Sequence, residues 1–191
     1  EGITFPFRHC CNSAATILYP EMHLDLVRPG IILYGLMPSE FLNGKISLIP
    51  AMKMKTVVSM TKTIPDGTPV SYGRIYTGEG DTAVATVPVG YADGYPRALS
   101  GKAFMRVGGA TVPVIGRICM DQCMLDVSSV DGVREGMTVT VLDDDPACPL
   151  SVDAVAAATG TINYEILCSI NKRVPRLYFR SDNIEAIADY M

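Results

Sequence analysis

Apolar and polar positions alternate in short runs over most of the chain. Strands are expected where β-branched and other apolar residues recur between turn signals, over residues 55–64, 81–89, 103–107, 110–115, 124–127, 137–142 and 173–179. Gly108-Gly109 separates two of these runs and predicts a hairpin, because both glycines tolerate positive φ. Helices are expected over residues 151–158, with Gly160 as the stop, and over 163–170. Regular strand spacing with one helical insertion predicts a β-barrel or sandwich.

Residues 1–44 follow a different pattern. Asn12 or Ser13 can cap a short helix, and residues 27–35 are expected to form a strand that feeds a Gly-rich turn. A strand–helix–strand rhythm is typical of α/β architecture. Residues 38–50 contain Pro, Ser, Asn and Gly and are expected to form a linker. The predicted fold class is therefore mostly β, with an α/β segment at the N-terminus.

Composition narrows the class of protein. The chain has 191 residues and a formal net charge of −4, and 48% hydrophobic against 19% charged residues exclude intrinsic disorder. With no basic block, nucleic acid is not the expected partner, and the apolar runs are too short to span a bilayer. The six cysteines match no zinc-site spacing, so we expect no metal and reduced thiols in a cytoplasmic protein. The chain starts at Glu1, without Met, and is expected to be part of a longer protein.

Two segments near the N-terminus have residues suited to binding an anion. Asn12-Ser13-Ala14 places a hydroxyl and free amides at a predicted helix start, although an ordinary helix cap has the same sequence. Arg28-Pro29-Gly30-Ile31 adds a permanent cation and a glycine that lets backbone N–H groups approach a ligand. On their own these residues predict a generic anion site and nothing more specific.

Three further segments place polar side chains in Gly-containing loops. They are residues 70–74, 89–97 and 116–122. A tyrosine such as Tyr72 transfers protons readily only if cationic neighbours lower its pKa from about 10. Arg74, Arg97 and Arg117 are cations of the right type for this role.

Six motifs, in order along the chain, resemble those of a known family. They read His9-x-x-Asn12-Ser13-Ala14, Val27-Arg28-x-Gly30-Ile31-x-x-Tyr34-Gly35, Val70-Ser71-Tyr72-Gly73, Val89-Gly90-Tyr91-Ala92-Asp93-Gly94, Gly116-Arg117-x-Cys119-Met120-Asp121-Gln122 and Thr161-Ile162-Asn163-Tyr164-Glu165. In these motifs the chain resembles the alanine racemases, pyridoxal-phosphate (PLP) enzymes that interconvert L- and D-alanine for cell-wall synthesis. The resemblance implies that residues 1–47 are the last units of a (β/α)8 barrel. It implies that residues 48–191 are the C-terminal β-domain, within a homodimer that shares its active sites.

The resemblance also implies roles for individual residues. Tyr72 would be one of two bases that exchange the α-proton, and the Met120 backbone N–H would bind the substrate carboxylate. Arg28 would face the pyridine nitrogen of PLP, to which it cannot give a proton. The other residues implied in cofactor binding are Ser13, Gly30, Ile31 and Tyr164. The residues implied in the corridor through which the substrate arrives are Tyr91, Arg97, Arg117 and Ile162.

The main departure from the family pattern concerns lysine. The second base of the family is the Lys that forms a Schiff base with PLP, and no Lys of this sequence lies in such a motif or before the first of the six motifs. Two-base racemisation needs proton donors on opposite faces of the α-carbon. We therefore expect the 191-residue chain to be inactive on its own.

Three alternatives stay open. Serine racemases of the vancomycin-resistance type share most of these motifs, but they tend to carry a smaller polar residue where this chain has Tyr164. PLP decarboxylases of the same architecture pair the pyridine nitrogen with a carboxylate, which Arg28 argues against. A non-catalytic β-domain used for association is compatible with the missing Lys, whereas the intact motifs around Tyr72 and Ser13 favour an enzyme.

Overall fold

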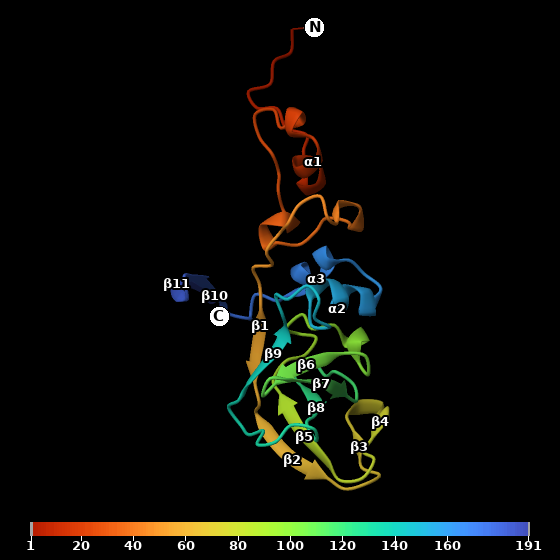
Figure 1. The fold of residues 1–191 in the computed structure, drawn as a ribbon. Helices are drawn as coiled ribbons and strands as arrows, with labels where there is room; N and C mark the ends of the chain where they lie inside the picture. The colour runs from red at the N-terminus through yellow and green to blue at the C-terminus, as the bar shows by residue number, and fades with distance from the viewer. Residues whose placement is uncertain (1, 191) are drawn as a thin grey trace. The chain divides into compact units, whose positions relative to one another are not determined.

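The computed structural model describes residues 2–190 and divides into two compact units, one up to Met52 and the other from Lys53 onward. Figure 1 shows the elements of each unit in chain order. The domain boundary expected between residues 47 and 48 stays a prediction.

The first unit is built from short helices. Helix α1 (Ser13–Leu18) begins where the sequence predicts, and Asn12 is its N-cap, with Oδ1 accepting the Ala15 N–H at 3.0 Å. A polar side chain at this position satisfies one of the free N–H groups of the first helical turn. Three 3₁₀ helices follow, at Pro20–Met22, Ile31–Tyr34 and Glu40–Leu42.

The strand predicted over residues 27–35 is wrong. Residues Ile31–Tyr34 form a 3₁₀ helix, and no strand is assigned in the part of the first unit that the structure describes. The Leu33 N–H donates to Gly30 O at 3.0 Å, and Gly35 ends the turn at φ 74°. An apolar run indicates burial, but a strand also needs a neighbouring strand to bond its backbone N–H and C=O groups. Here these groups form local turn hydrogen bonds instead.

Two segments of the first unit nevertheless run side by side in the same direction. The Asp25 N–H donates to Arg8 O at 3.1 Å, and the Arg28 N–H donates to Cys11 O at 2.9 Å. From the first bond to the second, the donor and the acceptor both move forward along the chain, so the two segments run in the same direction. Neither segment is assigned as a strand, and the hydrogen-bonded stretch stops just before the 3₁₀ helix Ile31–Tyr34.

The second unit is dominated by one seven-stranded antiparallel sheet. Its strands, in spatial order, are β1 (Met54–Val57), β9 (Thr138–Leu142), β6 (Phe104–Val107), β7 (Ala110–Ile115), β8 (Cys123–Asp126), β5 (Thr82–Val87) and β2 (Met60–Ile64). Alternate residues of the inner strands β6, β7, β8 and β9 are buried, including Met105, Val112, Leu125 and Val139. The mostly β architecture predicted from the strand spacing is confirmed.

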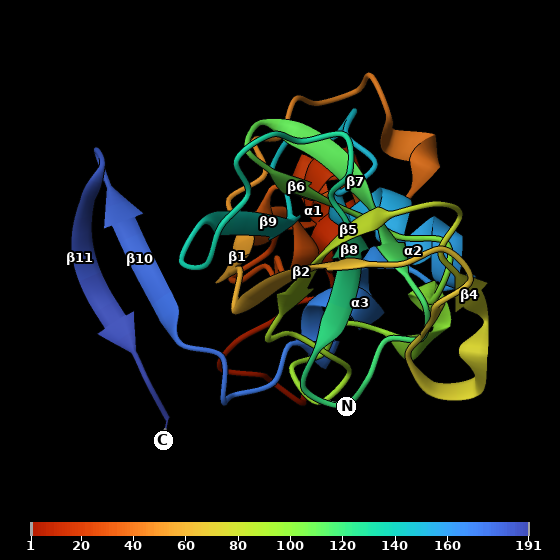
Figure 2. The same ribbon diagram turned by 90° about the horizontal axis from the view of Figure 1, so that it is seen from below.

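Residues 55–64, predicted as one strand, form two strands that pair at opposite ends of the sheet. Strand β1 pairs with β9, whereas β2 pairs with β5. Between them, the Val58 N–H donates to Met137 O and the Ser59 N–H donates to Thr86 O, both at 2.9 Å. One continuous stretch of chain thus joins the two edge strands, and the sheet curls on itself (Figure 2).

Several predicted turns and helices are confirmed. Gly108 and Gly109 have φ of +58° and +83° and connect β6 to β7. Helix α2 (Val152–Thr159) has Ser151 as N-cap and Gly160, at φ 74°, as its left-handed stop. The remaining elements of this unit are β3 (Pro69–Val70), β4 (Tyr76–Thr77), α3 (Asn163–Ser169) and the 3₁₀ helices Tyr72–Arg74 and Arg97–Leu99.

The predicted closing strand over residues 173–179 corresponds to β10 (Arg176–Arg180). It does not join the large sheet but pairs with β11 (Asn183–Ala188), which the sequence analysis did not predict. Large apolar side chains on this hairpin are exposed, among them Leu177, Phe179 and Ile187. The hairpin is therefore a separate two-stranded sheet.

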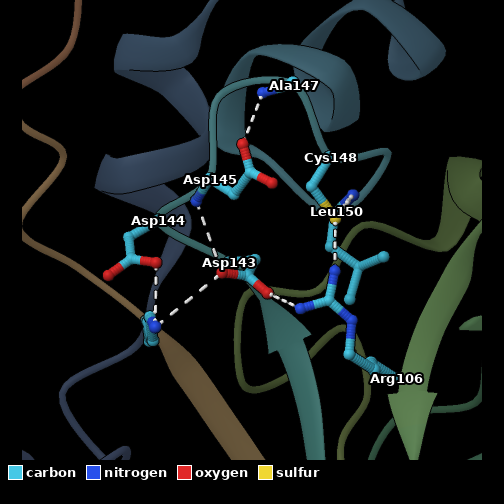
Figure 3. A network of polar contacts seen from close by, with 8 residues as sticks. Arg106, Asp143, Asp144, Asp145, Ala147, Cys148 and Leu150 are labelled. Atoms are coloured by element: carbon cyan, nitrogen blue, oxygen red, sulfur yellow. Dashed lines mark hydrogen bonds and ion pairs between the residues drawn. The ribbon is translucent and has the colours of Figure 1, made fainter. Parts of the chain in front are cut away.

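A polar network ties β6, β9 and the loop before α2 together (Figure 3). Arg106 donates from Nη1 to the buried Asp143 carboxylate at 2.5 Å and from Nη2 to Cys148 Sγ at 3.0 Å. Lys53 approaches the same carboxylate at 3.9 Å and lies 2.8 Å from Asp144. Burial raises the pKa of Asp143, but its hydrogen bonds and these two cations outweigh burial and hold the pKa below its usual value.

No helix within residues 2–190 has the length and apolarity to cross a membrane. Over the same residues, no group of three or more His, Cys, Asp or Glu is arranged to hold a metal ion.

Candidate active site

A pocket of about 560 Å³ lies in the second unit, where three loops meet. It is lined by Tyr72, Tyr91, Arg97, Arg117, Ile118, Cys119, Met120, Asp121 and Gln122. Five of these residues are ones that the sequence analysis singled out: Tyr72, Tyr91, Arg97, Arg117 and Met120. They come from well-separated parts of the chain, and the curled sheet brings their loops together.

Tyr72 stands on an unusual piece of backbone. Ser71 before it has φ +66°, rare for a residue with a side chain, and Gly73 after it has φ +71°. A Cβ at Gly73 would lie 2.9 Å from Arg117 Nε, so the glycine lets the guanidinium approach. Ser71 Oγ donates to Arg117 O at 2.6 Å. The Tyr72 loop is thus fixed to the Arg117 loop, and the Tyr72 side chain is 74% exposed.

The Met120 loop is held through its carbonyl groups. The Tyr91 N–H donates to Cys119 O at 3.1 Å, and the Ala92 N–H donates to Met120 O at 2.9 Å. Both oxygens converge on Gly90, where a Cβ would lie only 2.3 Å from each of them. A glycine is therefore required at position 90 for the two loops to come this close.

This arrangement decides where the N–H groups of the Met120 loop point. In a trans peptide the C=O and N–H point in opposite directions, and none of the described peptide bonds is cis. The N–H groups of Met120 and Asp121 therefore point away from residues 90–94. Neither N–H has an acceptor among residues 2–190. Successive free N–H groups on one side of a loop are a common anion-binding arrangement, and these two residues line the pocket.

The charges in the pocket favour a small anion. Arg97 and Arg117 contribute two permanent cations, and Asp121 is the one carboxylate among the lining residues. Two buried groups nearby are unsuited to proton transfer. Burial raises the pKa of the Tyr95 hydroxyl far above its usual value and that of the Cys123 thiol to about 12. Tyr72 and Tyr91 are the exposed phenols that line the pocket, and Tyr72 is the more exposed of the two.

The predicted site residues of the first unit lie close to one another. Ser13 is buried, and its Oγ accepts the Gly30 N–H at 2.8 Å. Ile31, next along the chain, is also buried. The Arg28 guanidinium donates to Nδ1 of His9, and no carboxylate pairs with Arg28 within residues 2–190.

Two predicted residues lie outside the pocket. Ile162 is 63% exposed and Tyr164 is 37% exposed at the start of α3, and neither is among the lining residues. Their expected roles in the substrate corridor and in phosphate binding stay predictions. The sequence analysis did not single out the other four lining residues, although its motif over residues 116–122 contained the signal. They are Ile118, Cys119, Asp121 and Gln122.

Comparison with known proteins follows the same division of the chain. Residues 51–178 match the family described as "Alanine racemase, C-terminal domain", and residues 1–38 match "Alanine racemase, N-terminal domain". The chain belongs to the alanine racemase family. The six motifs and the mostly β fold of the second unit agree with this assignment.

Individual relatives support the assignment over nearly the whole chain. An alanine racemase of Desulfovibrio desulfuricans is 51% identical over 178 residues, which are 93% of this chain and 47% of the relative. One of Clostridium tetani is 45% identical over 195 residues, 100% of this chain and 50% of the relative. The chain thus spans about half the length of the curated relatives it matches.

Solved structures agree as well. Alanine racemase of Clostridium difficile 630 in complex with cycloserine has a TM-score of 0.90 at 37% identity, covering 100% of this chain and 50% of that chain. The enzyme of Bacillus anthracis with bound L-Ala-P also has a TM-score of 0.90, at 36% identity, covering 99% of this chain and 49% of that chain.

Proposed function

We propose that this chain supplies part of the active site of a PLP-dependent alanine racemase that interconverts L- and D-alanine for cell-wall synthesis. In this proposal residues 1–47 are the end of a (β/α)8 barrel, and residues 48–191 are the β-domain. The observation that carries it is the pocket, which combines the exposed Tyr72 hydroxyl, two guanidinium groups and the free Met120 N–H. These are the groups needed to bind an amino acid by its carboxylate and to exchange a proton.

The residues proposed to hold PLP fit a phosphate group. Because the Ser13 hydroxyl only accepts a bond from Gly30, its own hydrogen is still free to donate to a phosphate oxygen. Gly30 has no Cβ, and the heavy atom nearest to the position that a Cβ would take is Ser13 Oγ, 3.9 Å away. This open space lets a ligand approach the backbone of Gly30 and Ile31. Tyr164 is proposed to add a hydrogen bond to the phosphate.

Arg28 is proposed to face the ring nitrogen of PLP. As a guanidinium it can donate a hydrogen bond but does not give up a proton, so the nitrogen stays unprotonated. When bound, PLP supplies the electron-withdrawing ring that makes the α-hydrogen of the substrate acidic. By leaving that nitrogen unprotonated, Arg28 would moderate the electron withdrawal and so favour quick return of the proton over side reactions.

The pocket residues complete the proposed mechanism. The Met120 N–H, with the Asp121 N–H beside it, binds the substrate carboxylate, while Arg97 and Arg117 attract it along the corridor that Tyr91 and Ile162 help to form. Tyr72 removes or returns the α-proton on one face of the substrate. In the family's dimer these groups act on the partner subunit's active site, so we propose a homodimer with shared sites. A second base, absent from the motifs of this chain, serves the opposite face.

The test is a chimaeric enzyme in which this chain replaces the matching segment of the Desulfovibrio desulfuricans alanine racemase. We expect it to interconvert L- and D-alanine, and to act on alanine faster than on serine. Tyr72→Phe should lower kcat at least about 100-fold, because general acid–base groups contribute about 10²–10⁴-fold. Tyr178→Phe, an exposed tyrosine of β10 outside the pocket, is the matched control.

The isolated chain supplies a second arm of the test. With added PLP it should form no borohydride-trapped lysine adduct and produce no D-alanine. D-alanine production by the chain alone would contradict the proposal, as would full activity of the Tyr72→Phe chimaera.

A further inference from the structure

A residue outside all six motifs connects the loops that form the pocket. Arg173 lies in the segment between α3 and β10 and donates from Nε to Asp93 Oδ1 at 2.8 Å. Its Nη2 donates to Asp121 Oδ1 at 2.6 Å. One guanidinium thus joins a carboxylate of the loop 90–94 to a carboxylate of the Met120 loop. Its planar, forked donors suit a bridge of this kind, which a lysine ammonium does not reproduce.

The first of these two carboxylates is already fixed. Asp93 Oδ2 accepts the Gly90 N–H at 2.8 Å, and Asp93 O accepts the Asn171 N–H at 3.1 Å. Ser169 Oγ also donates to Gly94 O at 2.9 Å. The segment that carries Arg173 is therefore attached to the loop 90–94 by bonds that do not involve its guanidinium.

The second carboxylate has no such support. The Asp121 side chain is 60% exposed, and its bond to Arg173 is the one hydrogen bond of that carboxylate found among the described residues. Asp121 shares a peptide unit with Met120, so its bond to Arg173 adds a restraint to a loop whose Cys119 and Met120 carbonyls already accept N–H groups of the loop 90–94. Losing the Arg173 guanidinium would therefore free the Asp121 side chain and loosen this part of the Met120 loop, while leaving the loop 90–94 in place.

The same contact has an electrostatic effect. Asp121 is the one carboxylate that lines a pocket proposed to bind a carboxylate ligand. Like charges in contact repel, and a guanidinium at hydrogen-bond distance offsets the negative charge. Without Arg173, an uncompensated carboxylate would stand beside the N–H groups that the substrate needs.

We propose that Arg173 is a positioning residue for substrate binding. It holds the Asp121 carboxylate, adds to the carbonyl bonds that steady the free Met120 N–H, and keeps the pocket wall from repelling the substrate carboxylate. This inference rests on the proposed racemase function, and it assigns Arg173 an effect on substrate affinity rather than on proton transfer.

Kinetics of the chimaeric enzyme separate this role from a merely structural one. Arg173→Gln should raise KM for L-alanine about tenfold, as expected when a charge-assisted hydrogen bond is lost, with kcat changed by no more than about twofold. Arg173→Lys should restore part of the affinity, since it keeps the charge without the fork. Arg180→Gln, in an exposed ion pair of the β10–β11 hairpin, is the matched control and should leave KM unchanged.

A double variant tests the electrostatic part. Asp121→Asn combined with Arg173→Gln should have a lower KM than Arg173→Gln alone, because the uncompensated carboxylate is gone. An unchanged KM in Arg173→Gln would overturn the proposal. A lower kcat and a lower Tm with the same KM would also overturn it, because they would indicate a merely structural role.

Amide hydrogen exchange on the 191-residue chain gives a readout that does not depend on racemase activity. Arg173→Gln should speed exchange at Tyr91 and Ala92, whose N–H groups donate to carbonyls of the Met120 loop, but not in the β6–β7 hairpin. If the chimaera is inactive and exchange still rises at these two amides, the proposed function fails while the positioning role of Arg173 stands. Unchanged exchange at both amides would overturn the positioning role.

Discussion

The two units of the chain bury their apolar residues to very different extents. In the second unit the sheet residues Met105, Val112 and Leu125 are fully buried. In the first unit the large side chains Phe5, Leu24, Leu26, Leu33, Phe41 and Ile49 are exposed. Burial of apolar surface is the main favourable contribution to folding. The second unit therefore has a hydrophobic core of its own, whereas local hydrogen bonds and caps supply much of the order in the first unit.

The largest expected effect tests the core of the second unit. Leu125→Ala, in the centre of β8 at 0% exposure, should lower the free energy of unfolding by about 2–5 kcal/mol, the usual cost of such a cavity. Leu33→Ala, at 69% exposure in the first unit, is the matched control and should change it by less than about 0.5 kcal/mol. Urea denaturation followed by far-ultraviolet circular dichroism measures both. Equal losses in the two variants would show that the units do not differ as described.

A smaller effect is expected from the polar network of the second unit. Asp143→Asn leaves Arg106 without its buried carboxylate partner and should cost about 2 kcal/mol, the typical value of a hydrogen bond to a charged group. Asp131→Asn, an exposed position with no ion pair in the described structure, is the control. Urea denaturation at neutral pH gives the difference.

The same network predicts a pH dependence. The pKa of Asp143 is lower in the folded chain than its usual value, so the folded state binds this proton less readily than the unfolded state does. The carboxylate therefore stabilises the fold above the unfolded-state pKa, and this contribution is lost as pH falls through the folded-state pKa. Urea midpoints measured from neutral pH down to about pH 3 should fall less steeply in Asp143→Asn than in the wild type. Parallel curves would mean that another carboxylate dominates the acid response.

The smallest effect tests the first unit. Asn12→Ala removes the side-chain acceptor of the Ala15 N–H and should destabilise α1 by about 1 kcal/mol. Faster amide exchange at Ala15, with no change in β6 and β7, is the expected result. Asn43→Ala, at an exposed position after the 3₁₀ helix Glu40–Leu42, serves as the control. A change that spread into the large sheet would show that the two units unfold together.

The sequence predicts those features that depend on local chemistry. The hairpin at Gly108-Gly109, the helix cap at Asn12 and the stop at Gly160 each follow from a residue's own backbone preference or side-chain acceptor. Features that depend on distant partners escape this reasoning. The bend at Val58–Ser59 is one, because its hydrogen bonds go to Thr86 and Met137.

The candidate site shows the same limit. Tyr72, Arg117 and Met120 were found because their motifs resemble those of a family, and their loops do meet at one pocket. Arg173 was missed because its partners Asp93 and Asp121 lie 80 and 52 positions away, and no local pattern connects them. The strand predicted from the apolar run over residues 27–35 is wrong for a related reason. A strand needs hydrogen-bonding neighbours, and the run itself does not specify them.

The way the sheet closes also bears on how the chain is made. Strand β1 has β9 as its one partner in the sheet, whereas β2 pairs with β5 much sooner along the chain. During synthesis from the N-terminus, β1 leaves the ribosome long before Thr138–Leu142 exists, so its backbone groups stay unpaired meanwhile. An unpaired strand is a template for pairing with other chains. The nascent protein is therefore most exposed to aggregation in the interval between the synthesis of β1 and that of β9.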